Sequence, residues 1–200
     1  MKEFVMNRLK CLFVILLLIT VSCNKGAGIE DTPEPLPTPE SGKTLIVYFS
    51  WSGNTRIAAN IIHDLTDCDM VEIEVEEPYS DVYNEVTARA RHELDNDTRP
   101  ALRTRIENMD KYDTLIVGTP IWGSHLAPSV KSFLAQYDLS DKIIAPFCTH
   151  GGSGTAQSVS DIREVCPDSE ILQPLAVYGS RAENSRNDVI QWLQTIGIIK

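Results

Sequence analysis

Several apolar segments between residues 45 and 178 are typical of β-strands. Residues 45–49 form a continuous apolar run and residues 114–118 form a second, which favours strands that are covered on both faces. Residues 70–75 instead alternate Val71, Ile73 and Val75 with two glutamates, which predicts an edge strand with one solvent-exposed face. Two more strands are predicted at residues 143–148 and 175–178.

The segments between these strands have the periodicity of amphipathic helices. The first of them has one buried stripe, made by Ile57, Ala58, Ile61, Ile62 and Leu65. Further helices are predicted at about residues 81–94, 127–137, 154–165 and 183–196. Strands that alternate with helices predict an α/β fold of three layers. We expect a doubly wound, five-stranded parallel sheet with strand order 2-1-3-4-5.

The start of the chain has the pattern of a signal peptide over residues 1–22. Lys2, Arg8 and Lys10 make it basic, and residues 11–21 are almost wholly apolar. This run is too short to cross a hydrocarbon layer of about 30 Å, so we expect a cleaved signal rather than a permanent helix. Its end, Thr20-Val21-Ser22-Cys23, resembles the lipobox of bacterial lipoproteins, in which the cysteine is lipidated.

The lipobox resemblance implies an exported protein of the bacterial cell envelope, anchored to a membrane through Cys23. The alternative is an ordinary secretory signal with an incidental cysteine. Residues 23–43 then form a proline-rich tether, because alternating prolines continue neither a helix nor a strand ladder. Residues 44–200 remain as the folded domain.

Charge and cysteine content exclude some functions. The formal net charge of −10 argues against non-specific binding of nucleic acid, which needs a basic surface. Cys68, Cys148 and Cys166 lie in the folded domain at spacings that suggest neither a disulfide framework nor a metal site. Cys148 is either a reactive thiol or a small packed residue. Five arginines are balanced by neighbouring acids and are expected on a solvated face: Arg89, Arg91, Arg99, Arg103 and Arg105.

In a doubly wound sheet, ligands bind beyond the carboxyl ends of the strands, which directs attention to three loops. The first loop, residues 50–55, is rich in hydroxyl and amide groups and leads directly into a helix. Helix N-termini favour anions, and no carboxylate occurs between Ser50 and Ile57. The loop lacks the lysine of a Walker A motif and the glycine pattern of a dinucleotide site. It therefore suits a terminal monophosphate that is held by neutral donors.

The run Phe49-Ser50-Trp51-Ser52-Gly53-Asn54-Thr55 closely resembles the phosphate-binding signature of flavodoxins. The resemblance extends from about residue 43 to residue 200, including a Thr-Pro-Ile-Trp loop at residues 119–122. It implies a flavodoxin-like fold and non-covalent binding of FMN. The residues expected to contact FMN are Ser50, Trp51, Ser52, Gly53, Asn54, Thr55, Thr119, Pro120, Ile121, Trp122, Gly123, Thr149, His150, Gly151, Gly152 and Gly154.

The other two loops bear on reactivity. Trp122 offers a large aromatic face to a flavin, although a buried structural role is the alternative. The third loop, residues 149–154, lacks the aromatic residue that many flavodoxins place over the outer flavin face. His150 is the candidate catalytic residue, as a proton donor; the alternative is that it only hydrogen-bonds its own loop. Tyr79 and Tyr83, after the second strand, are weaker candidates that would fold over the cofactor. His125 is another weak candidate: it either assists the second loop or, as we expect, has a surface role.

The leading functional hypothesis is an FMN-binding redox protein that transfers electrons while tethered to a membrane. Its partner is then a redox protein or a small electron acceptor, for which the quinone class is one candidate. One alternative is an FMN-dependent NAD(P)H:quinone-type oxidoreductase. Another is a non-redox binding module that has kept the fold and lost the cofactor.

Overall fold

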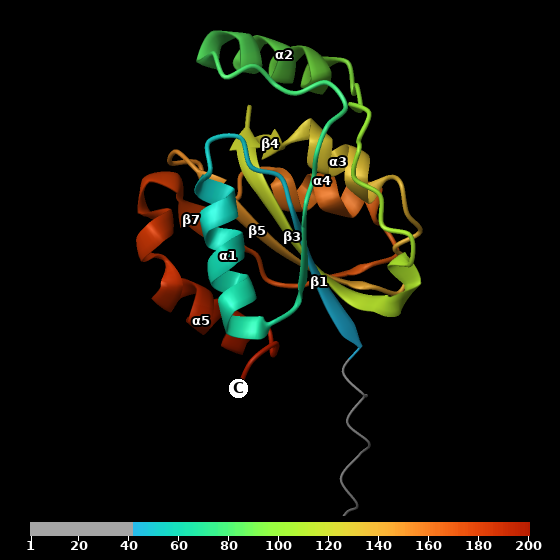
Figure 1. The fold of residues 1–200 in the computed structure, drawn as a ribbon, viewed down its shortest axis with the longest axis vertical. Coiled ribbons are helices and arrows are strands. Elements are labelled where there is room, and N and C mark those ends of the chain that lie inside the picture. Colours follow the sequence, from blue (N-terminus) through green and yellow to red (C-terminus); the bar gives the residue numbers. More distant parts are fainter. Residues whose placement is uncertain (1–41) are drawn as a thin grey trace, which may run out of the picture. The chain divides into compact units, whose positions relative to one another are not determined.

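The computed structural model describes residues 42–200, which form a three-layer α/β/α domain (Figure 1). The strands are β1 (Lys43–Tyr48), β2 (Asp69–Glu72), β3 (Tyr112–Trp122), β4 (His125–Leu126), β5 (Ile143–His150), β6 (Glu170–Ile171) and β7 (Leu175–Tyr178). The helices are α1 (Asn54–Thr66), α2 (Tyr83–Asp95), α3 (Pro128–Leu134), α4 (Ser158–Val165) and α5 (Arg186–Thr195). Two short 3₁₀ helices, η1 (Met109–Lys111) and η2 (Gly179–Asn184), precede β3 and α5.

The sheet confirms the predicted topology. Its parallel strands follow the order β2-β1-β3-β5-β6, and β7 also pairs with β5. The fifth strand position is thus divided between β6 and β7, with Pro174 in the interval. Since proline has no N–H to donate, it interrupts the ladder at this edge of the sheet. The predicted order 2-1-3-4-5 corresponds to these five positions.

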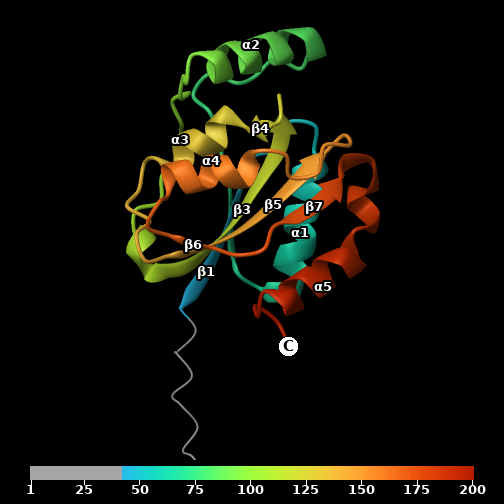
Figure 2. The same ribbon diagram turned by 180° about the vertical axis from the view of Figure 1, so that it is seen from behind.

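Alternation along β1 divides the core into two layers. Leu45 and Val47 pack with residues of α3 and α4, such as Phe133 and Ile162. Ile46 and Tyr48 belong to the opposite cluster, together with residues of α1 and α5. Figure 1 shows α1 and α5 on one side of the sheet, and Figure 2 shows α3 and α4 on the other. Continuous apolar strands are required because both faces are covered.

At the centre of the sheet, the side chains of Tyr48 and Phe147 lie close to the backbone of Gly118. A Cβ atom at Gly118 would lie 2.2 Å from the Phe147 ring and 2.7 Å from the Cβ of Tyr48. Glycine at this position lets β1, β3 and β5 lie together with large side chains between them. Beyond Gly118, β3 continues past the sheet and turns back through an antiparallel pair with β4, in which Trp122 lies opposite His125. We call residues 119–126 the β3–β4 hairpin.

Helix α2 stands over the carboxyl ends of the strands rather than on a face of the sheet (Figures 1 and 2). The chain reaches it along an extended segment after β2 and returns beside that segment. Two backbone hydrogen bonds, from Glu76 N to Ala101 O and from Arg103 N to Glu74 O, hold the two passes together. This excursion places a helix above the region where the ligand was expected.

Several predicted boundaries are wrong. The helix expected to end at residue 137 ends at Leu134, and the strand expected over residues 114–118 runs over Tyr112–Trp122. The second strand ends at Glu72 instead of residue 75, because the chain leaves β1 there and Val75 pairs with Leu102. The helix expected from residue 154 begins at Ser158, since Gly154 and Ala156 have positive φ angles of 61° and 45°. The helix expected from residue 183 begins at Arg186, after η2.

Within residues 42–200, no helix is long and apolar enough to cross a membrane. The predicted signal peptide and most of the tether, with Cys23, lie outside the described residues.

Candidate functional site

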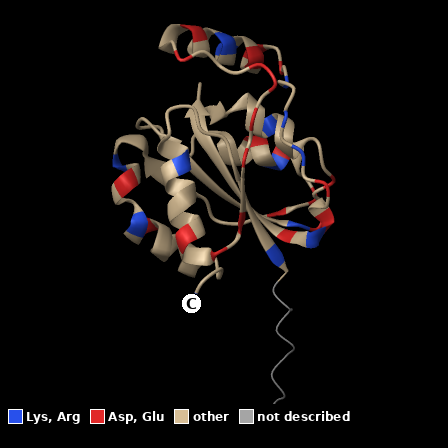
Figure 3. Ribbon diagram, viewed as in Figure 1, with Lys and Arg blue, Asp and Glu red and all other residues tan. Residues whose placement is uncertain are grey.

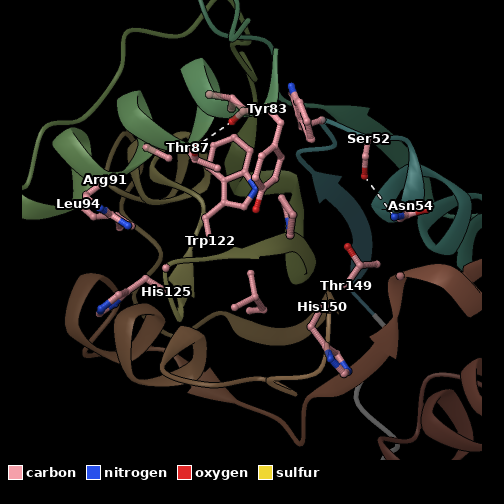
Figure 4. Close-up of a pocket in the computed structure, with 18 of the residues that line it drawn as sticks. Ser52, Asn54, Tyr83, Thr87, Arg91, Leu94, Trp122, His125, Thr149 and His150 are labelled. Atoms are coloured by element: carbon pink, nitrogen blue, oxygen red, sulfur yellow. Dashed lines mark hydrogen bonds between the residues drawn. The ribbon is translucent and has the colours of Figure 1, made fainter. Parts of the chain in front are cut away.

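A pocket of about 850 Å³ lies at the carboxyl ends of the strands, beneath α2 (Figure 4). It is lined by all three of the loops that sequence reasoning selected, together with α2, β4 and the end of β7. Its position agrees with the rule that doubly wound sheets bind ligands beyond the strand ends.

The loop at residues 50–55 forms one end of the pocket. Gly53 has a φ angle of 90°, in the region that favours glycine, and it turns the chain into α1. The backbone N–H groups of Ser52, Gly53, Asn54 and Thr55 donate to no acceptor among the described residues. The next amide, of Arg56, is satisfied by the Ser50 hydroxyl at 3.2 Å. Four unpaired donors at the start of a 13-residue helix make a site for an anion.

The charges next to this loop are already paired. The Arg56 guanidinium donates to both carboxylate oxygens of Glu72, at 2.9 and 2.6 Å. The Tyr48 hydroxyl also donates to Glu72, and burial together with this carboxylate raises the pKa of Tyr48 to about 12. Figure 3 shows no Asp or Glu in the loop itself. The anion site is therefore made of backbone and neutral groups, and Arg56 is engaged elsewhere.

An aromatic cluster forms the wall between the hairpin and α2. Trp122 meets Phe49 edge to face at 5.5 Å and Tyr79 at 5.0 Å between ring centroids. Trp51 donates from its indole nitrogen to the Ser80 carbonyl at 2.9 Å, which fixes its ring at the rim of the pocket. Trp122 both packs on the core and lines the pocket, so the two roles considered for it are compatible.

A buried polar network fastens α2 to this wall. The Tyr79 hydroxyl donates to Glu93 at 2.7 Å, and Arg89 donates to the other oxygen of Glu93 at 2.8 Å. The Arg89 guanidinium also lies over the Tyr79 ring, 4.1 Å from its centroid. Burial and the neighbouring carboxylate raise the pKa of Tyr79. Arg89 is thus a structural residue, and its assignment to a solvated face was wrong.

The third loop is connected to the first by a buried contact. The hydroxyls of Thr55 and Thr149 lie 2.8 Å apart. His150 lines the pocket, and its Nδ1 accepts a hydrogen bond from the Gly152 N–H at 2.9 Å. The ring of Tyr178 lies edge-on to His150 at 5.4 Å. Tyr178 is 45% exposed and lines the pocket, so β7 supplies an aromatic residue where the third loop lacks one.

Cys148 is a packed residue. It is only 2% exposed, and burial raises the pKa of its thiol to about 12. Its Sγ lies 3.7 Å from the Gly154 carbonyl. Of the two readings considered, a packed residue is the one that the structure supports. Within residues 42–200, no group of three His, Cys, Asp or Glu side chains is arranged to hold a metal ion.

Comparison with known proteins identifies the family. A family model described as flavodoxin matches residues 43–196. The chain belongs to the flavodoxin family. A candidate flavoprotein from Bacteroides eggerthii is 26% identical, with a TM-score of 0.70 over 80% of this chain and 99% of that one. A flavoprotein from Lactobacillus acidophilus, solved in complex with FMN, is 25% identical, with a TM-score of 0.60 over 72% and 97% of the two chains. A search of curated protein sequences finds no match.

The flavodoxin fold brings most of the predicted site residues to the pocket. Those that line it are Trp51, Ser52, Asn54, Pro120, Ile121, Trp122, Gly123, Thr149, His150 and Gly151. Six others do not line it: Ser50, Gly53, Thr55, Thr119, Gly152 and Gly154. These six shape the loops. For example, the Thr119 hydroxyl accepts the Ala127 N–H at 2.9 Å and so holds the base of the hairpin. Direct contact of each residue with a cofactor stays a prediction.

Of the residues in α2, sequence reasoning named only Tyr83 as a candidate to lie over the cofactor. The pocket-lining residues of α2 are Tyr83, Val86, Thr87, Ala90, Arg91, Leu94 and Asp95. Arg91 is exposed, as predicted, and it also lines the pocket. One signal was available in the sequence. Val86, Ala90 and Leu94 recur at helical spacing among polar residues, which gives this helix an apolar stripe that is expected to pack against another part of the protein. The pattern did not show what that stripe covers.

Proposed function

We propose that this protein is an FMN-binding redox protein that transfers electrons, tethered to a membrane of the bacterial cell envelope through lipidated Cys23. The prediction of FMN as the cofactor is confirmed by the family match and by the FMN complex of the Lactobacillus relative. Electron transfer is the function that this cofactor and this fold support best.

The observation that carries the proposal is the set of unpaired N–H groups at the start of α1. A phosphate monoester presents three acceptor oxygens, and four consecutive backbone N–H groups at this helix start have no acceptor among the described residues. Ser52 and Asn54, which carry two of these N–H groups, line a pocket that Trp51 and Trp122 also line. Aromatic side chains beside the anion site suit a flat ring system attached to that phosphate. Ser52 and Asn54 add neutral side chains to the same end of the pocket.

When bound, FMN supplies one-electron or two-electron transfer at its ring system. The chain supplies position and surroundings. The first loop holds the phosphate, Trp122 and Trp51 border the ring region, and α2 covers it from above. The Tyr79–Glu93–Arg89 network keeps α2 in place.

The direct experiment is a visible spectrum of the purified protein, followed by mass spectrometry of any cofactor released on denaturation. We expect the bands of an oxidised flavin and the mass of FMN in a ratio of about one per chain. Photoreduction should then bleach the bands, and adding a redox protein or a quinone as electron acceptor should restore them. A colourless protein that binds no added FMN would instead be the cofactor-free binding module.

A second candidate function, an FMN-dependent NAD(P)H:quinone-type oxidoreductase, is favoured by one observation. A histidine paired with a carboxylate lines the end of the pocket that lies away from the anion site. Steady-state oxidation of NADH or NADPH with a quinone acceptor separates the candidates. An oxidoreductase turns over repeatedly, whereas a carrier without its protein partner shows almost no turnover.

The proposed membrane tether is tested by analysing Cys23 for lipidation and by substituting it. We expect the exported chain to begin at Cys23 and to carry acyl chains, detectable as added mass on the N-terminal peptide. A Cys23→Ser variant should leave the membrane fraction, while its FMN spectrum stays unchanged because residues 44–200 hold the cofactor site. An unacylated N-terminus in the wild type would contradict the assignment to a lipid anchor.

A further inference from the structure

His125 is held by a buried carboxylate. Its Nδ1 lies 3.0 and 3.1 Å from the two oxygens of Asp161. Since a carboxylate only accepts hydrogen bonds, the proton of the neutral ring lies on Nδ1. Nε2 is then left to accept a proton, or to donate one when the ring is charged. The Asp161 side chain is 12% exposed, which strengthens its interaction with the ring.

Further hydrogen bonds hold His125 and Asp161 in position relative to each other. Asp161 lies on α4 and also accepts the backbone N–H of Leu126 at 3.0 Å. The Gln157 N–H donates to the Ser124 carbonyl at 2.9 Å, so the hairpin is tied to the start of α4 on both sides of His125. The position of the imidazole is therefore set by three hydrogen bonds between two elements.

His125 lines the pocket and is 35% exposed by its side chain. Figure 4 shows it with Arg91 at the end of the pocket opposite Ser52 and Asn54. Arg91 forms no ion pair or side-chain hydrogen bond with any described residue. A cation and a carboxylate-held histidine thus border the part of the pocket that the phosphate does not use.

We infer that His125 and Arg91 form a second-substrate site for a quinone, with His125 as the proton donor and Asp161 as its positioning residue. This inference rests on the proposed binding of FMN. A quinone that receives a hydride from the reduced flavin still needs one proton on its oxygen. The Nε2–H bond of charged His125 breaks and an O–H bond forms, which leaves a hydroquinone, oxidised flavin and neutral His125. Arg91 stabilises the negative charge that develops on the oxygen, and solvent returns the proton to His125.

His150, the residue that sequence reasoning favoured for this role, is arranged differently. Its Nδ1 accepts the Gly152 N–H within its own loop, and none of the described carboxylates is within hydrogen-bonding distance of it. The His125 ring is thus fixed by a carboxylate, whereas the His150 ring contacts its own loop and the Tyr178 ring.

Stopped-flow oxidation of the photoreduced FMN protein tests the inference with two acceptors. Benzoquinone needs protons, whereas ferricyanide takes single electrons and needs none. His125→Gln should slow oxidation by benzoquinone by about 100-fold, the lower end of the usual contribution of general acid catalysis, and leave the ferricyanide rate within about twofold. His92→Gln, an exposed histidine of α2 outside the pocket, should change neither rate. Added imidazole should partly restore the benzoquinone rate of His125→Ala.

Asp161→Asn keeps an oxygen for the Leu126 N–H and removes the carboxylate. We expect a slower benzoquinone reaction and, in ¹⁵N NMR spectra of the imidazole, loss of the single Nδ1–H tautomer of His125. Binding of 4-nitrophenolate to the oxidised protein provides a readout without turnover. Both His125→Gln and Arg91→Gln should weaken it by about tenfold, since each removes a charge-assisted hydrogen bond.

An unchanged benzoquinone rate in His125→Gln, or an equal loss with ferricyanide, overturns the inference while FMN binding stands. A slower reaction in His150→Gln alone also overturns it, because the proton then comes from the third loop. A chain that binds no FMN overturns the proposed function and this inference together, and the visible spectrum shows that result before any kinetics.

Discussion

The two ends of the pocket are built in different ways. At the anion end, consecutive residues of one loop present backbone N–H groups, and the only specialised conformation is the positive φ of Gly53. At the hairpin end, side chains from α2, β4 and α4 converge, and Asp161 and His125 are 36 residues apart. One end is a local motif, and the other depends on how distant elements pack. The residues that select the cofactor therefore lie in one short stretch of sequence. The residues proposed to take part in the reaction come together only when distant parts of the chain fold.

A carboxylate introduced at the anion end should have the largest effect. Ser52→Asp places a negative charge near the phosphate, and at about 5 Å and an effective dielectric constant near 20 the repulsion is about 3 kcal/mol. We expect FMN affinity to fall by at least about 100-fold, measured by quenching of flavin fluorescence. Ser160→Asp adds the same charge at an exposed position of α4 and should change affinity little. Similar losses in both variants would mean that total charge, and not the loop, governs binding.

The packing that supports the hairpin end is tested through Tyr79. Tyr79→Phe removes the donor to Glu93, a residue only 5% exposed, and should lower the free energy of unfolding by about 1–3 kcal/mol in urea denaturation. Tyr83→Phe removes a hydroxyl from a residue that is 68% exposed and should cost less than about 0.5 kcal/mol. Equal stabilities of the two variants would show that the buried network does not hold α2.

The contact between Thr55 and Thr149 joins the loop at the anion end to the third loop, which follows β5. Thr55→Val or Thr149→Val leaves one buried hydroxyl without its partner and should cost about 1 kcal/mol of unfolding free energy. The double variant should cost less than the sum, because no hydroxyl is then left unpaired. Additive losses would show that the two threonines act independently.

The smallest effect is expected at the cysteines. Burial raises the pKa values of Cys148 and Cys166 to about 12 and about 11, so both thiols keep their protons at pH 8 and react slowly. Peptide mapping after brief treatment with iodoacetamide should find Cys68, which is partly exposed, modified before the other two. Rapid labelling of Cys148 would contradict the packed role assigned to it.

Much of the fold was predictable because its signals are local. Apolar runs marked the strands, and helical spacing marked α1 and α5. The strand order, the family and FMN as cofactor are all confirmed. Errors arose at element ends, where a single torsion decides the outcome, as at Ala156 with its φ of 45°.

The rest of the site was not predictable from local patterns. Arg91 belongs to an arginine-rich segment and is exposed, as predicted. That it also lines the pocket follows only from the placement of α2 over the strand ends. Tyr178 reads as a strand residue, and its ring reaches the pocket because β7 ends beside β5 at His150. His125 has no neighbour in sequence that marks it, since its carboxylate comes from another helix.

The central claim, that unpaired backbone amides at residues 50–55 hold the phosphate of FMN, is tested most directly by comparing FMN with riboflavin. Both ligands carry the same ring system and differ in the phosphate. Titration of the cofactor-free protein should give binding of FMN that is tighter than that of riboflavin by about 100-fold or more, in line with charge-assisted hydrogen bonds to a helix N-terminus. Equal affinity for the two ligands would contradict the account.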